Sequence, residues 1–146
     1  MNTTIWLRVS AIISLLFTVG HFMGGLQNWS PMQDNPVLRS MRTVRFDVIG
    51  VSRSYLDLYM GFGHSLTVSL LLQSVLLWTL GNAARTHASL VRPMIAMFAV
   101  AVALTGVIAW KYIIPVPAFL SLALSAPLVM AFVAARSSPA GTALAT

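Results

Sequence analysis

The sequence predicts an all-α integral membrane protein: a four-helix bundle with a long, partly ordered loop between its first two helices. Of its 146 residues, 58% are hydrophobic and only 8% are charged, and the mean hydropathy is +0.83. Soluble domains carry a charge on about a quarter of their residues, so this composition excludes an ordinary soluble domain. In addition, four apolar runs each approach the roughly 20 residues that a helix needs to cross a bilayer core of about 30 Å.

The four predicted spans lie at about 5–24, 55–80, 90–110 and 113–134. The first lacks a small-residue cleavage site after its apolar stretch, so we expect a retained helix rather than a signal peptide. Gly81 and Asn82 should end the second span, and Pro115 and Pro117 should start or kink the fourth. We expect a single transmembrane domain with a loose polar tail over 136–146.

The connection over residues 26–54 is much longer than the others and follows no single period. Loops of this length without their own structure are uncommon unless they are functional or disordered. This one mixes charged residues with apolar ones, namely Trp29, Met41, Val44, Phe46, Val48, Ile49 and Val51. We therefore expect a short amphipathic piece that lies on the membrane surface or folds back over the bundle.

The net charge of +6 comes from nine Lys and Arg against three Asp. In a membrane protein such an excess marks loop ends and contacts with lipid headgroups, so we expect no nucleic-acid partner. The absence of cysteine excludes disulfides and thiolate metal sites. Basic residues are divided four to five between the two sides, which leaves orientation nearly undetermined. Because the loop arginines alternate with Asp47 and Asp57 and can belong to a site, cytoplasmic termini in a bacterial inner membrane are favoured.

Polar residues on the first helix recur at steps of three and four, which places them on one face that should point into the bundle. They are Ser10, Ser14, Thr18, His21 and Gly25. On the second helix, Asp57 and His64 share a face, since seven residues make nearly two turns, although about 10 Å of axial rise separates them. His21 and His64 both lie towards the long loop, so they should reach a similar depth.

These features predict an intramembrane polar site under the long loop. Its candidate residues are His21, Arg45, Asp47, Arg53, Tyr55, Asp57, His64 and Lys111. Apolar walls would accept a lipid, quinone, sterol-like or other lipophilic molecule, and the polar side chains would fix its polar end. If the site is catalytic, His64 is the general acid or base and Asp57 sets its orientation or charge. The sequence leaves enzymatic activity open.

Other interpretations stay open beside this one. His21 and His64 can supply two axial ligands to a b-type haem. Small residues close by would leave room for the flat cofactor: Gly24, Gly25, Gly61 and Gly63. No other metal site is expected. Alternatively, the protein is an accessory or structural membrane subunit, in a homo-oligomer or with a partner subunit that its loop docks. Each histidine can also be only an interhelical hydrogen-bond partner, and Asp57 can simply cap its helix.

The segments "TVGHFMGGLQNWSP" and "RFDVIGVSRSYLDLYMGFGHS" resemble an uncharacterised family of small bacterial four-helix membrane proteins. That family is loosely similar in plan to the DoxX-like proteins. The resemblance covers most of the chain and implies four membrane helices with a polar or charged connection after the first. It implies no activity, and no functional residue is carried over from it.

Overall fold

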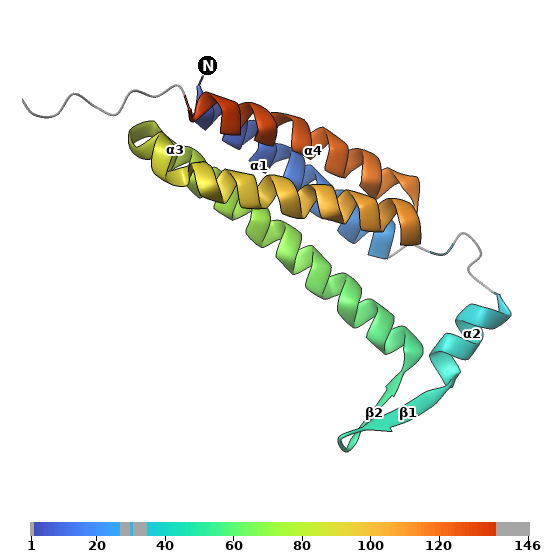
Figure 1. Ribbon diagram of the computed structural model, residues 1–146. Coiled ribbons are helices and arrows are strands. Elements are labelled where there is room, and N and C mark those ends of the chain that lie inside the picture. Colours follow the sequence, from blue (N-terminus) through green and yellow to red (C-terminus); the bar gives the residue numbers. More distant parts are fainter. Residues whose placement is uncertain (1, 27–29, 31–34, 137–146) are drawn as a thin grey trace, which may run out of the picture. The chain divides into compact units, whose positions relative to one another are not determined.

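The computed structural model describes residues 2–26, 30 and 35–136 and is predominantly helical (Figure 1). In chain order the elements are α1 (Thr3–Gly20), the π-helix η1 (His21–Leu26), α2 (Pro36–Thr43), β1 (Arg45–Val48), β2 (Val51–Ser54), α3 (Tyr55–Tyr112) and α4 (Pro115–Ala134). The predicted helical class is confirmed at this level. The two short strands were not predicted.

Three helical segments are long and apolar enough to cross a membrane: Thr3–Gly24, Tyr55–Tyr112 and Pro115–Ala134. The chain forms two compact units. We call Met1–Phe17 with Leu72–Thr146 the core unit, and Thr18–Leu71 the loop unit. α1 and α3 each contribute residues to both units.

α3 consists of two helical arms that meet at a kink. His87, with φ −132° and ψ 49°, is the residue outside the helical region there. The helix end expected at Gly81 and Asn82 is not observed, because the first arm runs past both residues to this kink. A Cβ atom on Gly81 would lie 3.5 Å from Leu7 and Arg8 of α1. Gly81 thus lets two helices approach closely, which explains its place inside a helix.

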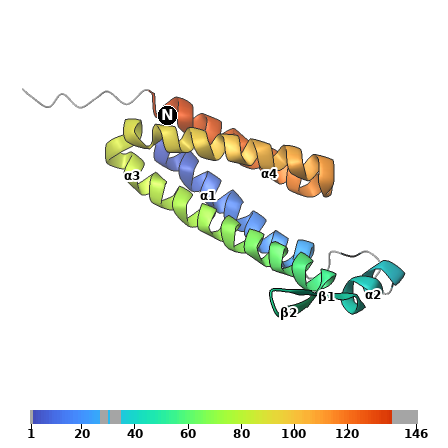
Figure 2. The same ribbon diagram turned by 60° about the horizontal axis from the view of Figure 1, so that its bottom comes forward.

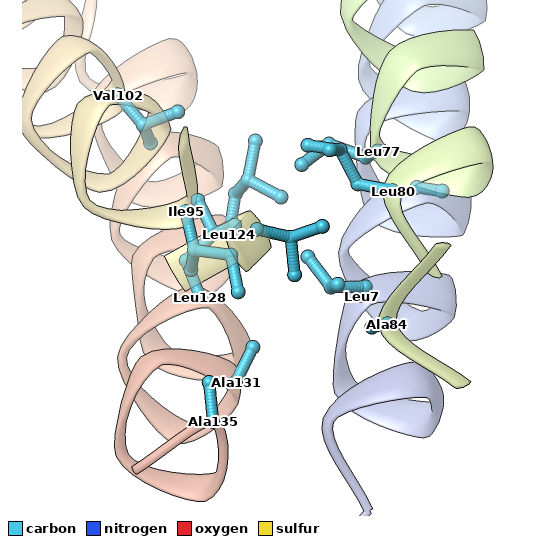
Figure 3. Close-up of a cluster of buried hydrophobic side chains, with 12 residues drawn as sticks. Leu7, Leu77, Leu80, Ala84, Ile95, Val102, Leu124, Leu128, Ala131 and Ala135 are labelled. Atoms are coloured by element: carbon cyan, nitrogen blue, oxygen red, sulfur yellow. The ribbon is translucent and has the colours of Figure 1, made fainter. Parts of the chain in front are cut away.

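An apolar core fills the core unit between α1, the two arms of α3, and α4 (Figure 3). Its buried members are Leu7, Ala11, Leu77, Leu80, Ala84, Val91, Ile95, Val102, Leu124, Leu128, Ala131 and Ala135. In Figure 3, Leu7 and Leu77 lie across from Leu124 and Ile95. Lipid tails are as apolar as leucine, so in a bilayer such a core is held by van der Waals packing and interhelical hydrogen bonds rather than by exclusion of water.

The second arm of α3, residues 88–112, and α4 form an antiparallel helical hairpin (Figures 1 and 2). α4 begins at Pro115, as predicted, because a first-turn proline lacks an N–H group that would have no helical partner anyway. The rings of Trp110 and Phe119 meet edge to face, with centroids 6.2 Å apart. A Cβ atom on Gly106 would lie 3.1 Å from the Cβ atom of Ser121, so this glycine permits close helix contact.

Part of the long connection has secondary structure of its own. α2 begins after Asn35, whose side-chain oxygen accepts the Leu38 N–H at 2.8 Å and so caps the helix. β1 and β2 then pair antiparallel around a turn at Ile49 and Gly50. Within the predicted loop, 27–29 and 31–34, including Trp29, lie outside the described residues, as does the predicted loose tail beyond Arg136.

Candidate functional site

The polar stripe predicted on α1 faces the interior of the protein. Ser10 and Ser14 are fully buried, Thr18 is nearly so, and His21 is half-buried. The prediction of an inward-facing stripe is confirmed for these four residues. In the core unit, the Gln73 amide donates a hydrogen bond of 3.0 Å to the Ser14 hydroxyl, so the stripe joins α1 to α3.

In the loop unit, His21, which directly follows α1, makes a polar contact with α3. Its Nδ1 atom lies 2.9 Å from the Thr67 hydroxyl oxygen. His21 is also the first residue of the π-helix η1, in which the helix of α1 widens before it ends. π-helical turns are rare and often occur at functional sites. The histidine is therefore held at a local irregularity of the backbone.

The tautomer of His21 depends on where the Thr67 hydroxyl proton goes. The Thr67 hydroxyl donates to the carbonyl of Gly63, one turn earlier, at 3.2 Å. A hydroxyl has one proton, so when this proton is committed to Gly63, the Thr67 oxygen accepts the Nδ1–H of His21. Nδ1 is then protonated and Nε2 keeps its lone pair. His21 can accept a hydrogen bond from a ligand, or coordinate one, through Nε2.

Two apolar side chains of η1, Leu26 and Phe22, lie against the first arm of α3. Leu26, the last residue of η1, is buried directly over Gly63, where no room is left for a Cβ atom. The ring of Phe22 lies near that of His64, with centroids 6.4 Å apart and planes tilted by 47°. A Cβ atom on Gly24 would have no neighbour within 4 Å, whereas one on Gly63 would overlap Leu26. Of these two glycines, only Gly63 is therefore needed for close packing.

The face of α3 that carries Asp57 and His64 is exposed in the described chain. His64, Ser65 and Ser69 are all exposed, and Gly61 has no atom within 4 Å of a potential Cβ. Thr67, which contacts His21, lies on the neighbouring face. In the described chain His21 is therefore half-buried, whereas His64 is exposed.

Asp57 forms a capping box with Ser54 at the start of α3. The Ser54 N–H donates to Asp57 Oδ2 at 2.8 Å, and the Asp57 N–H donates to the Ser54 hydroxyl at 3.1 Å. This reciprocal pair satisfies backbone donors that a helix start otherwise leaves open. The hydrogen bonds of Asp57 in the described chain therefore serve the helix start.

The other predicted loop residues build the hairpin and its junction with α3. Arg45 donates from Nε to the Ser52 hydroxyl at 3.2 Å and from its terminal nitrogen to the Ser52 carbonyl at 3.1 Å. Arg53 donates to the same carbonyl at 3.0 Å. Asp47 is exposed and lies opposite Ser52 in the register. The Arg45 guanidinium thus bonds across the hairpin, whereas Arg53 bonds to the preceding residue of its own strand.

Tyr55 and Lys111 belong to different units. The Tyr55 ring packs on that of Phe46, with centroids 5.0 Å apart, and so attaches β1 to the start of α3. Lys111, at the end of α3, has its ammonium group 5.1 Å from the centre of the Tyr112 ring in the core unit. Over the described residues, no three His, Cys, Asp or Glu side chains form a group that could hold a metal ion.

Sequence reasoning missed Thr67 and Gln73 as partners of the α1 stripe. A signal for this face exists in the spacing of one series of residues on the first arm, which alternates between four and three. The series is Gly63, Thr67, Leu70, Ser74, Leu77, Gly81 and Ala84. Such spacing defines one side of a helix, and its small and polar members are typical of helix contacts in membranes.

No protein-family model, curated protein or solved structure matches the chain. The resemblance to DoxX-like proteins therefore has neither support nor contradiction from these comparisons. The case for a function depends on the geometry of the chain itself.

Proposed function

We propose that the protein is a multi-pass integral membrane protein that binds a lipophilic small molecule where the end of α1 meets the start of α3. The observation that carries this proposal is the hydrogen bond of His21 to Thr67, which orients the imidazole and leaves Nε2 as an acceptor. A ligand with a hydroxyl or other donor group would bind there by its polar end. An ionisable residue inside a membrane span is by default a functional candidate.

The surroundings of His21 suit an apolar ligand body. Phe22, Met23 and Phe62 are exposed side chains of the loop unit close in sequence to the two histidines. A ligand that lies in the bilayer would reach them laterally, without passing through water. His64, whose ring neighbours Phe22, supplies a second polar contact. The proposed activity is binding. Asp57 is assigned to the capping box rather than to acid-base chemistry with His64.

The length of α3 supports four membrane crossings. A crossing takes roughly 20 residues, and α3 has 58 with a kink at His87. Its two arms are therefore long enough for two crossings, and α1 and α4 supply two more. The predicted second and third spans correspond to these arms.

The distribution of charge favours termini on the cytoplasmic side of a bacterial inner membrane. All three aspartates belong to the loop unit, so the core unit carries basic residues without acidic ones. Figures 1 and 2 show the start of α1, the kink of α3 and the end of α4 at one end of the core unit. Arg8, Arg85, Arg92 and Arg136 come from these segments. The loop side carries one basic residue more, but its arginines alternate with Asp47 and Asp57 and can belong to a site, so we take the core-unit arginines as the cytoplasmic group.

Haem binding is the second candidate function, and one observation favours it. Histidines that ligate a metal usually donate their other ring N–H to an acceptor, as His21 does to Thr67 in the assigned tautomer. His64 would be the second axial ligand. A Soret band in the purified protein that disappears in both His21→Ala and His64→Ala would establish this candidate in place of the first.

A thermal-shift screen in mild detergent tests the proposed binding. Ubiquinol, menaquinol, cholesterol and monoolein, which all carry hydroxyl donors, serve as probes for the wild type, His21→Ala and the control His87→Ala, which alters an exposed histidine of the core unit. We expect at least one probe to stabilise the wild type and His87→Ala but not His21→Ala. Equal shifts in all three proteins would show that His21 is only a packing residue, as an accessory subunit requires.

A further inference from the structure

We infer that the hairpin of β1 and β2 is an interfacial anchor. Its apolar face and tip insert into the headgroup region of the phospholipid bilayer, on the side of the membrane at which α1 ends and α3 begins. This inference rests on the proposed crossing of the membrane by α1, α3 and α4. It does not depend on which ligand His21 binds. Three observations carry it: the division of the hairpin into two faces, the backbone of its turn, and its place at the start of α3.

The register of the strands gives the hairpin one polar and one largely apolar face. Side chains opposite each other in an antiparallel pair lie on the same face, and successive ones alternate. Arg45 with Ser54 and Asp47 with Ser52 therefore form the polar face. Phe46 with Arg53 and Val48 with Val51 form the other.

The apolar face ends in an exposed tip. Val48 and Val51 are about half exposed, and Ile49, the first residue of the turn, is 98% exposed. The described chain covers Val48 and Val51 only in part and leaves Ile49 almost fully exposed. In a hairpin surrounded by water, three adjacent exposed aliphatic side chains would be unfavourable.

The backbone of the turn is unusual for the residue it carries. Ile49 has φ 50° and Gly50 has φ 77°, so both lie in the left-handed region. Two-residue hairpin turns of this kind normally have Asn, Asp or Gly at the first position. A β-branched residue is a genuine outlier there. Among the described residues, the isoleucine has neither a favourable turn geometry nor a side chain that packs on its neighbours, which fits a partner outside the chain.

The position of the hairpin makes the bilayer its partner. β2 leads directly into α3 at Tyr55. The hairpin therefore lies immediately before the residue at which an apolar span begins. Within the loop unit, Figure 1 shows it extending sideways from the start of α3 rather than continuing the helix. Arg53 lies on the apolar face, nearer the base than the tip. An arginine at this place can reach lipid phosphates while the tip enters the acyl boundary.

Single-cysteine variants test the inference, since the chain has no cysteine of its own. Ile49→Cys places a nitroxide spin label on the tip, and Ser52→Cys places one on the polar face of the same hairpin. Val68→Cys labels an exposed position of α3 thirteen residues into the helix. Each labelled full-length protein is reconstituted into vesicles of phosphatidylethanolamine and phosphatidylglycerol. Electron paramagnetic resonance then measures collision with oxygen, which concentrates in lipid, and with a water-soluble nickel chelate.

We expect the label at position 49 to favour oxygen over the chelate by at least threefold relative to the label at position 52. If Ile49→Cys fails to fold, Val48→Cys reports on the same face. Labels at 49 and 52 that are equally accessible to the chelate would overturn the inference, and so would a label at 49 shielded from both reagents, which indicates a protein partner. Chelate access at Val68→Cys would instead refute the membrane crossing itself.

Discussion

His21 Nδ1 and the Thr67 hydroxyl oxygen lie 2.9 Å apart, and this hydrogen bond joins the π-helical end of α1 to the first arm of α3. Thr67 in turn donates to the carbonyl of Gly63. The imidazole is therefore oriented by a helix that is separate from its own. With the Thr67 proton on Gly63, His21 keeps Nε2 as an acceptor, and its contact with Thr67 distinguishes it from the exposed His64.

Thr67→Val should release the His21 ring, because valine keeps the shape of threonine but cannot accept the Nδ1 proton. We expect the free energy of unfolding to fall by about 0.5–1.5 kcal/mol, the usual net contribution of one hydrogen bond. Nitrogen-15 NMR of labelled histidine should show the Nδ1-protonated tautomer in the wild type and a tautomer mixture in the variant.

Two variants control this prediction. Thr67→Ser retains the hydroxyl and should retain the tautomer. Thr105→Val removes an exposed threonine hydroxyl that donates to its own helix, at the Ala101 carbonyl, and should leave the His21 signal unchanged. An unaltered histidine spectrum in Thr67→Val would mean that this hydrogen bond does not orient the ring.

Ser14 and Gln73 should be energetically coupled. Their 3.0 Å hydrogen bond joins α1 to α3 beside the apolar core. Double-mutant cycles in a membrane protein give about 0.6 kcal/mol for such bonds and at most about 1.7 kcal/mol. Unfolding of Ser14→Ala, Gln73→Leu and the double variant by SDS in mixed micelles should give a coupling in this range. Strict additivity would show that the two side chains act independently.

The capping box predicts how the start of α3 responds to substitution. Ser54→Ala should lower the free energy of unfolding by about 1 kcal/mol, as loss of an N-cap usually does. Asp57→Ala should also destabilise. Asp57→Asn keeps an oxygen that can accept the Ser54 N–H, so stability and ligand binding should both survive. If Asp57→Asn stays folded but loses binding, Asp57 belongs to the ligand site, as the sequence alone had suggested.

Gly61 and Gly63 should respond in opposite ways to alanine. Nothing lies within 4 Å of a Cβ atom at Gly61, so Gly61→Ala should gain helix propensity of up to about 1 kcal/mol. At Gly63 the new methyl group would overlap the side chain of Leu26, which is buried. Gly63→Ala should therefore gain nothing or destabilise. Equal stabilisation by both, measured by SDS unfolding, would contradict the packing of Leu26 over α3.

Local sequence pattern was sufficient to predict where the long helices lie, because a span needs about 20 apolar residues. It was not sufficient to place the end of the second span. The local sequence predicts a helix end at Gly81, but the role of this glycine depends on α1, which approaches it closely. The hairpin also escaped prediction, since Ile49 stands where a turn usually shows Asn or Asp. Contacts that involve a second element cannot be read from one segment.

The candidate site, like the fold, could be predicted within one segment but not where two helices meet. The three- and four-residue spacing on α1 correctly predicted that Ser10, Ser14 and His21 face inward. On α3, polar residues occur on more than one face, and periodicity alone could not show which face meets α1. The sequence points to His64 because its side chain is ionisable, but the side chain that hydrogen-bonds to His21 is that of Thr67.

Mass spectrometry of the small molecules that copurify with the protein in mild detergent tests the central claim most directly. Wild type, His21→Ala and His87→Ala are purified in parallel from membranes, and their organic extracts are compared at equal protein amounts. We predict a lipophilic compound that is enriched with the wild type and His87→Ala, and depleted at least tenfold in a folded His21→Ala. The same compounds in the same amounts from all three proteins would contradict a ligand site at His21.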